Sequence, residues 1–540
     1  MKIKKIGILA LTLMLLVNIL TGCSKKEEVA VEEALKEEVT KEESKELVIC
    51  TAKELTNLTT LTMNKENNIA CGLIYEPLVK YENDKIVPNL AKEWEWNDEG
   101  TVLTFKLQEG IKYHDGEDFN AESVKKALDF NHLNPNFSGI KAVAELEKVE
   151  VIDEYTVAIT FPRPSLFYIN DFCFQNVMSM MSPNVIEEGN YQTFTDVIGT
   201  GPYVRESFIS GDSTVFVRNE NYWGEKPYYE KIIVKYIPEN SSRIQALNSG
   251  EVDLVYGADL ITYDDFTQAI SLKDIKGQVN ENPTLTRNLI LNASSETLSD
   301  INIRRAIAYG VNKKAIAEGL TLGNEKVAER LFRKGTPYTD VEIDEVYDYN
   351  VDKAKEYIEK SGWTLNESTN IYEKDGKKLS ILYTYWTDLS LSNEIAQAVK
   401  ADLGKIGIAV ITEGKDQMTW WVDGVEGKYD ITTWNTEGSY TEPNKFFTES
   451  MGADPHNISY QGLDNYEDIK GQIEEFSNTK DEERVKEIFK VLLNENNNNV
   501  VDLPISYAKD LVVYNGNKIK SYNFSSVPQF FDIFGVVPNN

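Results

Sequence analysis

The longest part of the chain, residues 47–540, contains no apolar run approaching the roughly 18 residues that a membrane-spanning helix needs. This part is also too long for one hydrophobic core, because single cores stop growing beyond about 250–300 residues. A hydrophobic content of 41%, with 11% aromatic residues, is ample for buried cores. We therefore predict a water-soluble body of two or three domains.

Residues 1–22 have the pattern of a secretory signal. Lysines near the start precede an apolar stretch at residues 6–19, which is too short for a comfortable membrane span. The stretch ends in residues 20–23 (LTGC), which resemble the lipobox of bacterial lipoproteins. The resemblance implies that Cys23 is diacylated and becomes the mature N-terminus, anchored on the extracellular face of the cell membrane. The alternative is an ordinary signal peptide with a chance cysteine.

Residues 23–46 are predicted to form a charged tether between the lipid and the body. Pairs of Glu recur every five residues from Glu27, with no aromatic residue among them. A five-residue period matches neither the helical nor the coiled-coil repeat, so no single apolar stripe forms. A stable helix packed on the body is the alternative.

The net charge of −31 limits the partners of the chain. Such acidity argues against binding to nucleic acid or to anionic lipid headgroups. It is compatible with cationic solutes, although a solvated acidic surface is the commoner reason. Apart from Cys23, three irregularly spaced cysteines remain, and they form neither a disulfide framework nor a CxxC metal site. We expect Cys50, Cys71 and Cys173 to be buried thiols.

The body has the patterning of an α/β protein. Apolar alternation predicts strands at residues 101–107, 155–161 and 231–237. Helical periodicity predicts helices at residues 121–130, 302–310, 351–360 and 393–406. Alternating helices and strands fit sheets covered by helices, with a cleft between lobes as the natural ligand site.

Six short motifs in order along the body resemble the family 5 extracellular solute-binding proteins of ABC importers, which bind dipeptides, oligopeptides or nickel. They are residues 113–120 (YHDGEDFN), 198–203 (IGTGPY), 217–224 (VRNENYWG), 248–254 (NSGEVDL), 302–309 (NIRRAIAY) and 503–507 (LPISY).

That resemblance implies a bilobal, class C α/β fold, in which two strands crossing between the lobes form a hinge. By analogy, lobe I takes residues 47–286, with an extra subdomain at about 71–197. Lobe II takes residues 287–499, and residues 500–540 return to lobe I. The resemblance also implies a monomer that captures a solute outside the membrane and delivers it to an ABC permease.

Residues 433–456 are most similar to the nickel-transport binding proteins. Those proteins carry a Trp, a Tyr-Asp-Pro and, just past a Ser-Met, a His that can reach a chelated metal. Trp434, Tyr440 and His456 match these positions. Glu442 replaces the Asp, and two residues are inserted between Trp434 and Tyr440. The resemblance implies that His456 is a metal ligand and that the two aromatic residues wall the pocket.

The chemistry of nickel indicates a chelate rather than a bare ion. Nickel prefers imidazole and other nitrogen or oxygen ligands, and one protein imidazole cannot saturate it. The nickel binders hold chelate carboxylates with lobe I arginines, and this chain has no arginine at the matching positions. Arg287 and Arg333 are candidates for that role, since guanidinium binds carboxylates bidentately. Trp386 is a candidate wall of the cleft.

Other residues have simpler interpretations. His114 lies in a turn shared by many relatives, and we expect it to be structural. Trp420 and Trp421 are predicted to belong to the core rather than to the site.

A peptide importer is the alternative function. Peptide binders must neutralise a ligand ammonium group, for which a carboxylate in the cleft is suited. Oligopeptide binders carry an Asp directly before the matching Tyr, where this chain has Ser439. Glu437 lies two residues away and is a candidate substitute.

An extracellular enzyme is the opposing class. The sequence has no Gly-x-Ser-x-Gly elbow, no His-Glu-x-x-His motif and no phosphate loop. None of the three histidines lies in such a motif, so the sequence offers few residues for acid–base catalysis or zinc-dependent hydrolysis. We predict no enzymatic activity and no prosthetic group. A pure adhesin or receptor is the remaining non-transport option.

Overall fold

A computed structural model describes residues 45–56, 58, 68–134, 140–174, 177–187, 189, 195–257, 260–438, 442–527 and 530–539. The predicted signal, the lipid site Cys23 and nearly all of the predicted tether lie outside the described residues. None of the described helices is long and apolar enough to cross a membrane.

The first lobe is built on a seven-stranded sheet with the order β12-β22-β11-β1-β10-β9-β8. Its strands are β1 (Glu46–Thr51), β8 (Tyr203–Ile209), β9 (Ser213–Arg218), β10 (Lys231–Tyr236), β11 (Leu254–Tyr256), β12 (Ile275–Val279) and β22 (Leu511–Asn515). Side chains alternate across β1, because Leu47 and Ile49 join one core and Val48 and Cys50 join another. The second of these cores lies beneath α5 (Asn240–Ser249) and α6 (Tyr263–Ile270).

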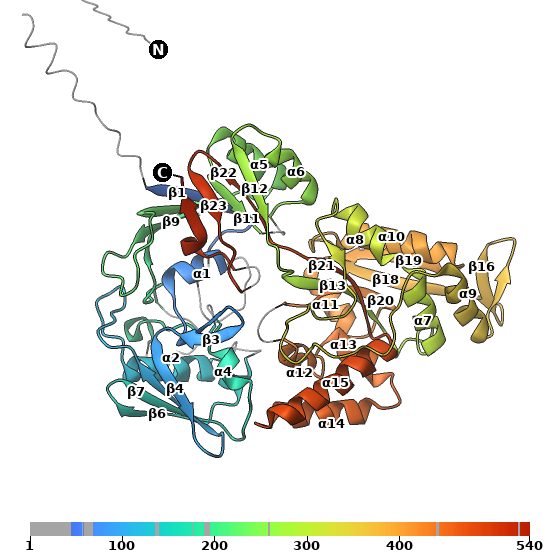
Figure 1. Cartoon of the computed structure of the whole chain (residues 1–540), viewed down its shortest axis with the longest axis horizontal. Coiled ribbons are helices and arrows are strands. Elements are labelled where there is room, and N and C mark those ends of the chain that lie inside the picture. The colour runs from blue at the N-terminus through green and yellow to red at the C-terminus, as the bar shows by residue number, and fades with distance from the viewer. Residues whose placement is uncertain are drawn as a thin grey trace, which may run out of the picture. The chain divides into compact units, whose positions relative to one another are not determined.

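A smaller subdomain and several hairpins complete the first lobe. The subdomain has a four-stranded sheet, β4-β5-β7-β6, with helices beside it (Figure 1). Its elements are β4 (Ala91–Trp96), β5 (Val102–Leu107), β6 (Lys148–Asp153), β7 (Thr156–Thr160), α2 (Ala121–Leu133), α3 (Lys141–Ala144) and α4 (Tyr168–Asp171). The other elements are α1 (Asn68–Ile74) and the pairs β2 (Val79–Glu82) with β3 (Lys85–Pro88) and β23 (Ile519–Tyr522) with β24 (Val536–Pro538).

The second lobe is built on a six-stranded sheet with the order β14-β21-β13-β20-β18-β19. Its strands are β13 (Leu285–Leu291), β14 (Lys326–Val327), β18 (Ser380–Trp386), β19 (Ala409–Lys415), β20 (Ile431–Asn435) and β21 (Asp502–Ala508). The small sheet of β15 (Thr364–Asn366), β16 (Ile371–Lys374) and β17 (Lys377–Lys378) extends from it.

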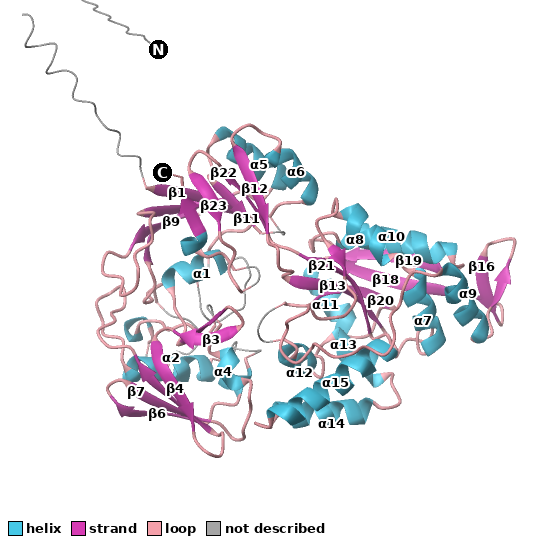
Figure 2. Cartoon of the chain, in the orientation of Figure 1, coloured by secondary structure: helices cyan, strands magenta, loops and turns pink. Residues whose placement is uncertain are grey.

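Helices flank this sheet and form two cores, one of which includes residues of its strands (Figure 2). One core includes α7 (Ile301–Gly310), α8 (Lys313–Leu320), α9 (Val351–Lys360) and α10 (Ser392–Lys405). The other includes α12 (Asn444–Glu449), α13 (Pro455–Gln461), α14 (Tyr466–Ser477) and α15 (Glu482–Asn498). The remaining helix is α11 (Gln417–Val425).

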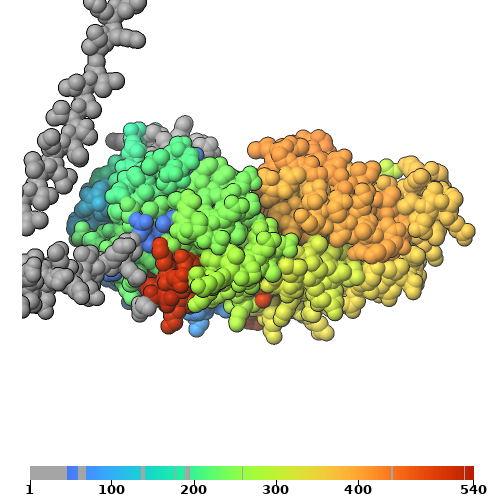
Figure 3. All heavy atoms as spheres, turned by 90° about the horizontal axis from the view of Figure 1, so that it is seen from above, coloured from blue at the N-terminus to red at the C-terminus, as the bar shows by residue number. Residues whose placement is uncertain are grey.

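Two chain crossings join the lobes. Residues 280–284 lead from β12 to β13, and residues 509–510 lead from β21 back to β22 (Figure 1). The crossings bond to each other, because the Thr284 N–H donates to the Ala508 carbonyl at 2.8 Å and the Asn280 N–H to the Asp510 carbonyl at 2.9 Å. Beside them, the surface of the first lobe (green) adjoins that of the second (yellow to orange) (Figure 3).

Strand pairing shifts the expected lobe boundaries. Leu285 pairs with Ala508 at the end of the β13–β21 ladder, so the chain stays in the second sheet up to Ala508. The second lobe therefore begins at residue 285 rather than 287, and the return to the first lobe comes at residues 509–510 rather than at 500. The motif at 503–507 thus belongs to the second sheet, which a pattern within one strand does not reveal.

The predicted elements are all present, with ends that differ by no more than a few residues. The helix at 351–360 matches α9, and the strand at 231–237 matches β10 except for its last residue. Cys50, Cys71 and Cys173 are free and buried, as expected.

Candidate ligand-binding pocket

A hollow of about 270 Å³ opens on the second lobe. Among the described residues, its lining includes four tryptophans, four carboxylates, one lysine and one histidine. These side chains are Trp386, Trp420, Trp421, Trp434, Glu437, Glu442, Glu449, Asp454, Lys445 and His456. Aromatic walls with a few polar groups are typical of a small-molecule site.

The sheet brings the aromatic walls together. β18 and β20 run parallel, so their carboxyl ends, which carry Trp386 and Trp434, lie at the same edge of the sheet. α11 adds Trp420 and Trp421, and the Trp420 ring centroid lies 6.1 Å from that of Trp386 and 5.5 Å from that of Trp434. The prediction that these two tryptophans are core residues holds for Trp420 and leaves out a second role. Trp420 is buried, but both line the pocket because α11 covers this edge.

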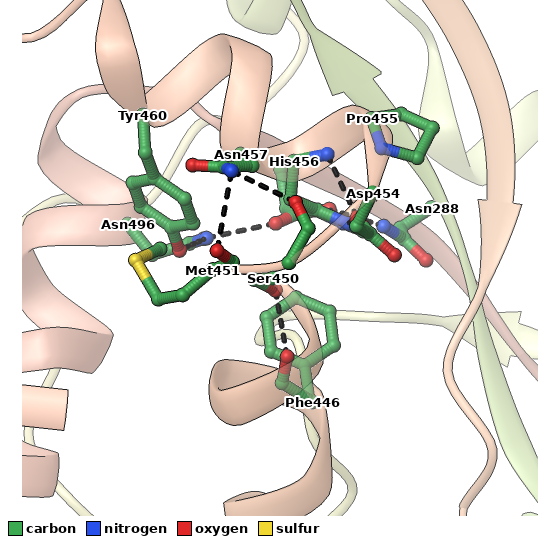
Figure 4. Close-up of polar contacts among 12 residues, drawn as sticks. Asn288, Phe446, Ser450, Met451, Asp454, Pro455, His456, Asn457, Tyr460 and Asn496 are labelled. Carbon is green, nitrogen blue, oxygen red and sulfur yellow. Dashed lines mark hydrogen bonds and ion pairs between the residues drawn. The ribbon is translucent and has the colours of Figure 1, made fainter. Parts of the chain in front are cut away.

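His456 lies in the pocket wall between two carboxylates. Its Nδ1 is 2.6 Å from Asp454 Oδ1, and its Nε2 is 3.2 Å from Asp502 Oδ1. Asp454 is the N-cap of α13 and also accepts the His456 backbone N–H at 2.8 Å. Figure 4 shows His456 with Asp454, and Phe446 below them. The imidazole meets the Trp434 ring edge-on, with centroids 5.1 Å apart.

The surroundings favour the protonated form of His456. Burial opposes a charge on the ring, yet the carboxylates of Asp502 and Asp454 outweigh burial and raise the pKa of His456 to about 10. The side chain is only 1% exposed. His456 is therefore a packed residue of the second lobe, where its ring joins α13 to β21.

Glu437, Lys445 and Glu449 form a second charged group in the pocket. Lys445 Nζ lies 2.6 Å from Glu437 Oε2 and 3.5 Å from Glu449 Oε1. Burial favours the neutral amine, but Glu437 and Glu449 raise the pKa of Lys445 above its usual range. Glu437 is thus already paired with a cation from its own lobe.

Glu442 holds the loop that precedes α12. Its carboxylate accepts the backbone N–H groups of Glu437 at 2.6 Å and Gly438 at 2.8 Å. Burial and the charge of Glu437 raise the pKa of Glu442 to about 8. Tyr440, which the sequence placed in the pocket wall, lies outside the described residues.

The two candidate arginines do not line the pocket. Arg287 is buried on β13, where its Nε donates to Glu325 at 3.0 Å and its Nη1 to the Ser390 carbonyl at 2.9 Å. Arg333 lies beyond β14 and is half-buried. Arg287 is thus held by Glu325 and Ser390, whereas the Arg333 Nε is buried without a hydrogen-bond partner in the described part of the chain.

The structure thus brings Trp386, Trp434, Glu437 and His456 into one pocket. Sequence reasoning missed Lys445, Glu449 and the two partners of His456. Asp454 had a local signal, since Asp-Pro at a helix start indicates an N-cap followed by Pro. His114 contacts the Gly201 carbonyl at 2.9 Å through Nε2, which fits the expected structural role. No group of three or more His, Cys, Asp or Glu in the described part of the chain is arranged to hold a metal ion.

The fold and the pocket define a bilobal α/β solute-binding protein. The sequence model of the bacterial extracellular solute-binding proteins, family 5 (middle region), matches residues 85–457. The chain belongs to this family of ABC-importer binding proteins.

Two relatives are similar over most of their length. The nickel-binding periplasmic protein of Escherichia coli K12 is 30% identical over 82% of this chain and 85% of its own. NikA from Brucella suis, solved in complex with Fe(III)-EDTA, is 28% identical, with a TM-score of 0.87 over 92% of this chain and 100% of its own. The oligopeptide-binding protein AppA from Bacillus subtilis, at 18% identity and a TM-score of 0.74 over 92% of this chain and 99% of its own, shares the fold.

Proposed function

We propose that this protein captures a nickel chelate outside the membrane and delivers it to an ABC permease. The observation that carries the proposal is the position of His456, which meets the edge of Trp434 in the wall of an aromatic pocket. A metal-binding histidine usually donates one ring N–H to a carboxylate, which fixes the orientation of the imidazole. Asp454 is placed to accept such a bond from Nδ1 of His456. The Nε2 contact with Asp502 is longer, at 3.2 Å, and Asp502 lies outside the lining of the hollow.

The relatives add support to this choice of ligand. The E. coli relative is named a nickel-binding periplasmic protein and aligns with most of this chain, and B. suis NikA was solved with a metal chelate, Fe(III)-EDTA. Peptide binding is the alternative. It is weakened by the pairing of Glu437 with Lys445 at 2.6 Å, because the carboxylate suggested for a peptide ammonium already has a cation.

Calorimetry with nickel plus L-histidine, and separately with a mixed peptide pool, tests the proposal. His456→Gln should weaken nickel-chelate binding by tenfold or more, because one ligand to the metal is lost. Glu437→Gln should have a smaller effect. His132→Gln is a matched control, since His132 lies on α2 of the first lobe and contacts the Val143 carbonyl.

Thermal unfolding of each variant must accompany the titrations, because His456 is buried. Tight peptide binding that Glu437→Gln destroys and His456→Gln leaves intact would reject the nickel assignment in favour of peptide import.

We also propose that Cys23 carries the lipid that anchors the protein. The motif LTGC supports it, and the acidic segment that follows has no apolar stripe to hold a membrane by itself. Cys23→Ala should remove the lipid and move the protein from the membrane to the soluble fraction, measured by fractionation and by mass spectrometry of the N-terminal peptide. Full membrane association of the variant would contradict the anchor.

A further inference from the structure

Each cation of the pocket is shared by two carboxylates. Lys445 lies between Glu437 and Glu449, at 2.6 and 3.5 Å. His456 lies between Asp454 and Asp502, at 2.6 and 3.2 Å. In the Lys445 group one positive charge faces two carboxylates of the lining, so this group carries an excess negative charge when both are ionised, whereas Asp502 of the other group lies outside the lining.

Glu442, the remaining charged residue of the described lining, does not reverse this balance. Glu442 is occupied by backbone N–H groups of its own loop. Arg287 pairs with Glu325, and neither it nor Arg333 lines the pocket. In the described lining, therefore, every cation is already held by carboxylates, and a ligand carboxylate would have to compete with them.

The tryptophan rings in the pocket walls also favour a cationic ligand. The faces of tryptophan rings carry the negative part of the quadrupole and attract cations within about 6 Å. The ring nitrogen of Trp420 donates to Thr432 Oγ1 at 2.8 Å, so this N–H is directed into the protein, whereas the buried ring nitrogen of Trp386 has no partner in the described part of the chain.

From this arrangement we infer that the pocket selects a ligand with net positive charge and that carboxylate groups on the ligand weaken binding. The inference rests on the proposed function and narrows its ligand class. The preferred cargo is a metal complex of amine and imidazole donors, and polycarboxylate complexes are disfavoured.

Nickel complexes of histamine and of L-histidine form a matched pair of probes. Both supply an imidazole and an amine, and only histidine adds a carboxylate. Titration of the full mature chain, followed by tryptophan fluorescence and calorimetry, should give a Kd at least tenfold lower for nickel–histamine. Nickel–EDTA should not compete with it. The measurement belongs at pH 8, because burial raises the pKa of Glu449 to about 7 and the carboxylate must be ionised.

The variant Glu449→Gln tests whether the preference for nickel–histamine arises from the charges in the pocket. Removing one of the two charges beside Lys445 should reduce the histamine-to-histidine preference at least threefold. Glu426→Gln is the control, because Glu426 is exposed at the end of α11 and pairs with Lys428. Equal or tighter binding of nickel–histidine, competition by nickel–EDTA, or a preference unchanged in Glu449→Gln would overturn the inference.

If the proposed nickel function is wrong, the titrations give a different pattern of binding. If neither nickel complex binds and peptides do, the nickel assignment is wrong. The charge preference is then tested with one peptide in two forms, one with a free C-terminal carboxylate and one with an amidated C-terminus. Tighter binding of the amidated peptide upholds the inference, whereas equal or weaker binding rejects it.

Discussion

At the scale of single residues, the central feature is a histidine whose two ring nitrogens both meet carboxylates. Asp454 and Asp502 lie at 2.6 and 3.2 Å from His456 in a buried setting. An imidazole must be unprotonated to bind a metal, so proton and metal compete for the same site. The two aspartates thus orient the ring and also hold the proton that a metal must displace.

This competition gives a pH dependence. Because the pKa of His456 is raised to about 10, its proton is held throughout the neutral range and is lost only as the pH approaches that value. Nickel-chelate affinity should therefore rise steadily from pH 6.5 to 9, rather than reach a plateau just above 6.5. Calorimetry at pH 7.5 in buffers of different ionisation enthalpy should show about one proton released per ligand. The His456→Gln variant should lack this release, and its absence in the wild type would contradict the role of His456.

At the scale of elements, the loop between β20 and α12 is held against a crossing between the lobes. Gly438 has a φ of +65°, and a Cβ placed on it would lie 1.3 Å from the Thr284 carbonyl oxygen. Thr284 belongs to the crossing at residues 280–284. The backbone of the pocket loop therefore touches the segment that joins the lobes, and only glycine allows this contact.

Gly438→Ala should displace this loop. A left-handed backbone costs alanine about 1 kcal/mol, and the clash with Thr284 adds to it. We expect a lower Tm and a ligand affinity reduced at least fivefold, because Glu437 and Glu442 move with the loop. Gly471→Ala on α14 is the control, since a Cβ there meets no atom within 4 Å. Unchanged affinity in Gly438→Ala would show that the loop position does not matter for binding.

At the scale of the whole molecule, the subdomain of the first lobe contacts the second lobe far from the crossings. Phe167 is buried in the second lobe's core and meets Tyr338, Phe476 and Phe489 edge-on, at centroid distances of 6.2, 5.9 and 6.2 Å. Beside it, the Leu166 N–H donates to the Thr479 carbonyl at 3.3 Å. These contacts stabilise an arrangement in which the lobes touch at a second place.

Phe167→Ala should favour separation of the lobes, because the aromatic contact is lost while each lobe keeps its own core. Small-angle scattering of the ligand-free variant should give a larger radius of gyration than the wild type, and saturating ligand should reverse the difference. Phe105→Ala is the control, since Phe105 is buried within the four-stranded sheet against Phe172. An unchanged radius in Phe167→Ala would mean that this contact does not influence the lobe equilibrium.

Local patterns in the sequence were enough to predict the α/β class, the family and many elements. The period of α9 and the alternation along β10 depend on neighbours within one element, and these neighbours are read directly from the sequence. The same holds for Trp386, Trp434 and His456, which lie in recognisable segments and line the pocket.

Only the tertiary structure decided how those residues are paired. His456 meets Asp502, 46 residues away, because the tertiary fold brings β21 within hydrogen-bond distance of the helix that carries the histidine. Arg287, suggested as a ligand residue, instead meets Glu325, 38 residues away, inside the second lobe. The physical reason is that a charged side chain leaving water takes the partner that packing places beside it. That partner depends on which strands pair, and the hydrophobic periodicity of a single segment does not predict strand pairing.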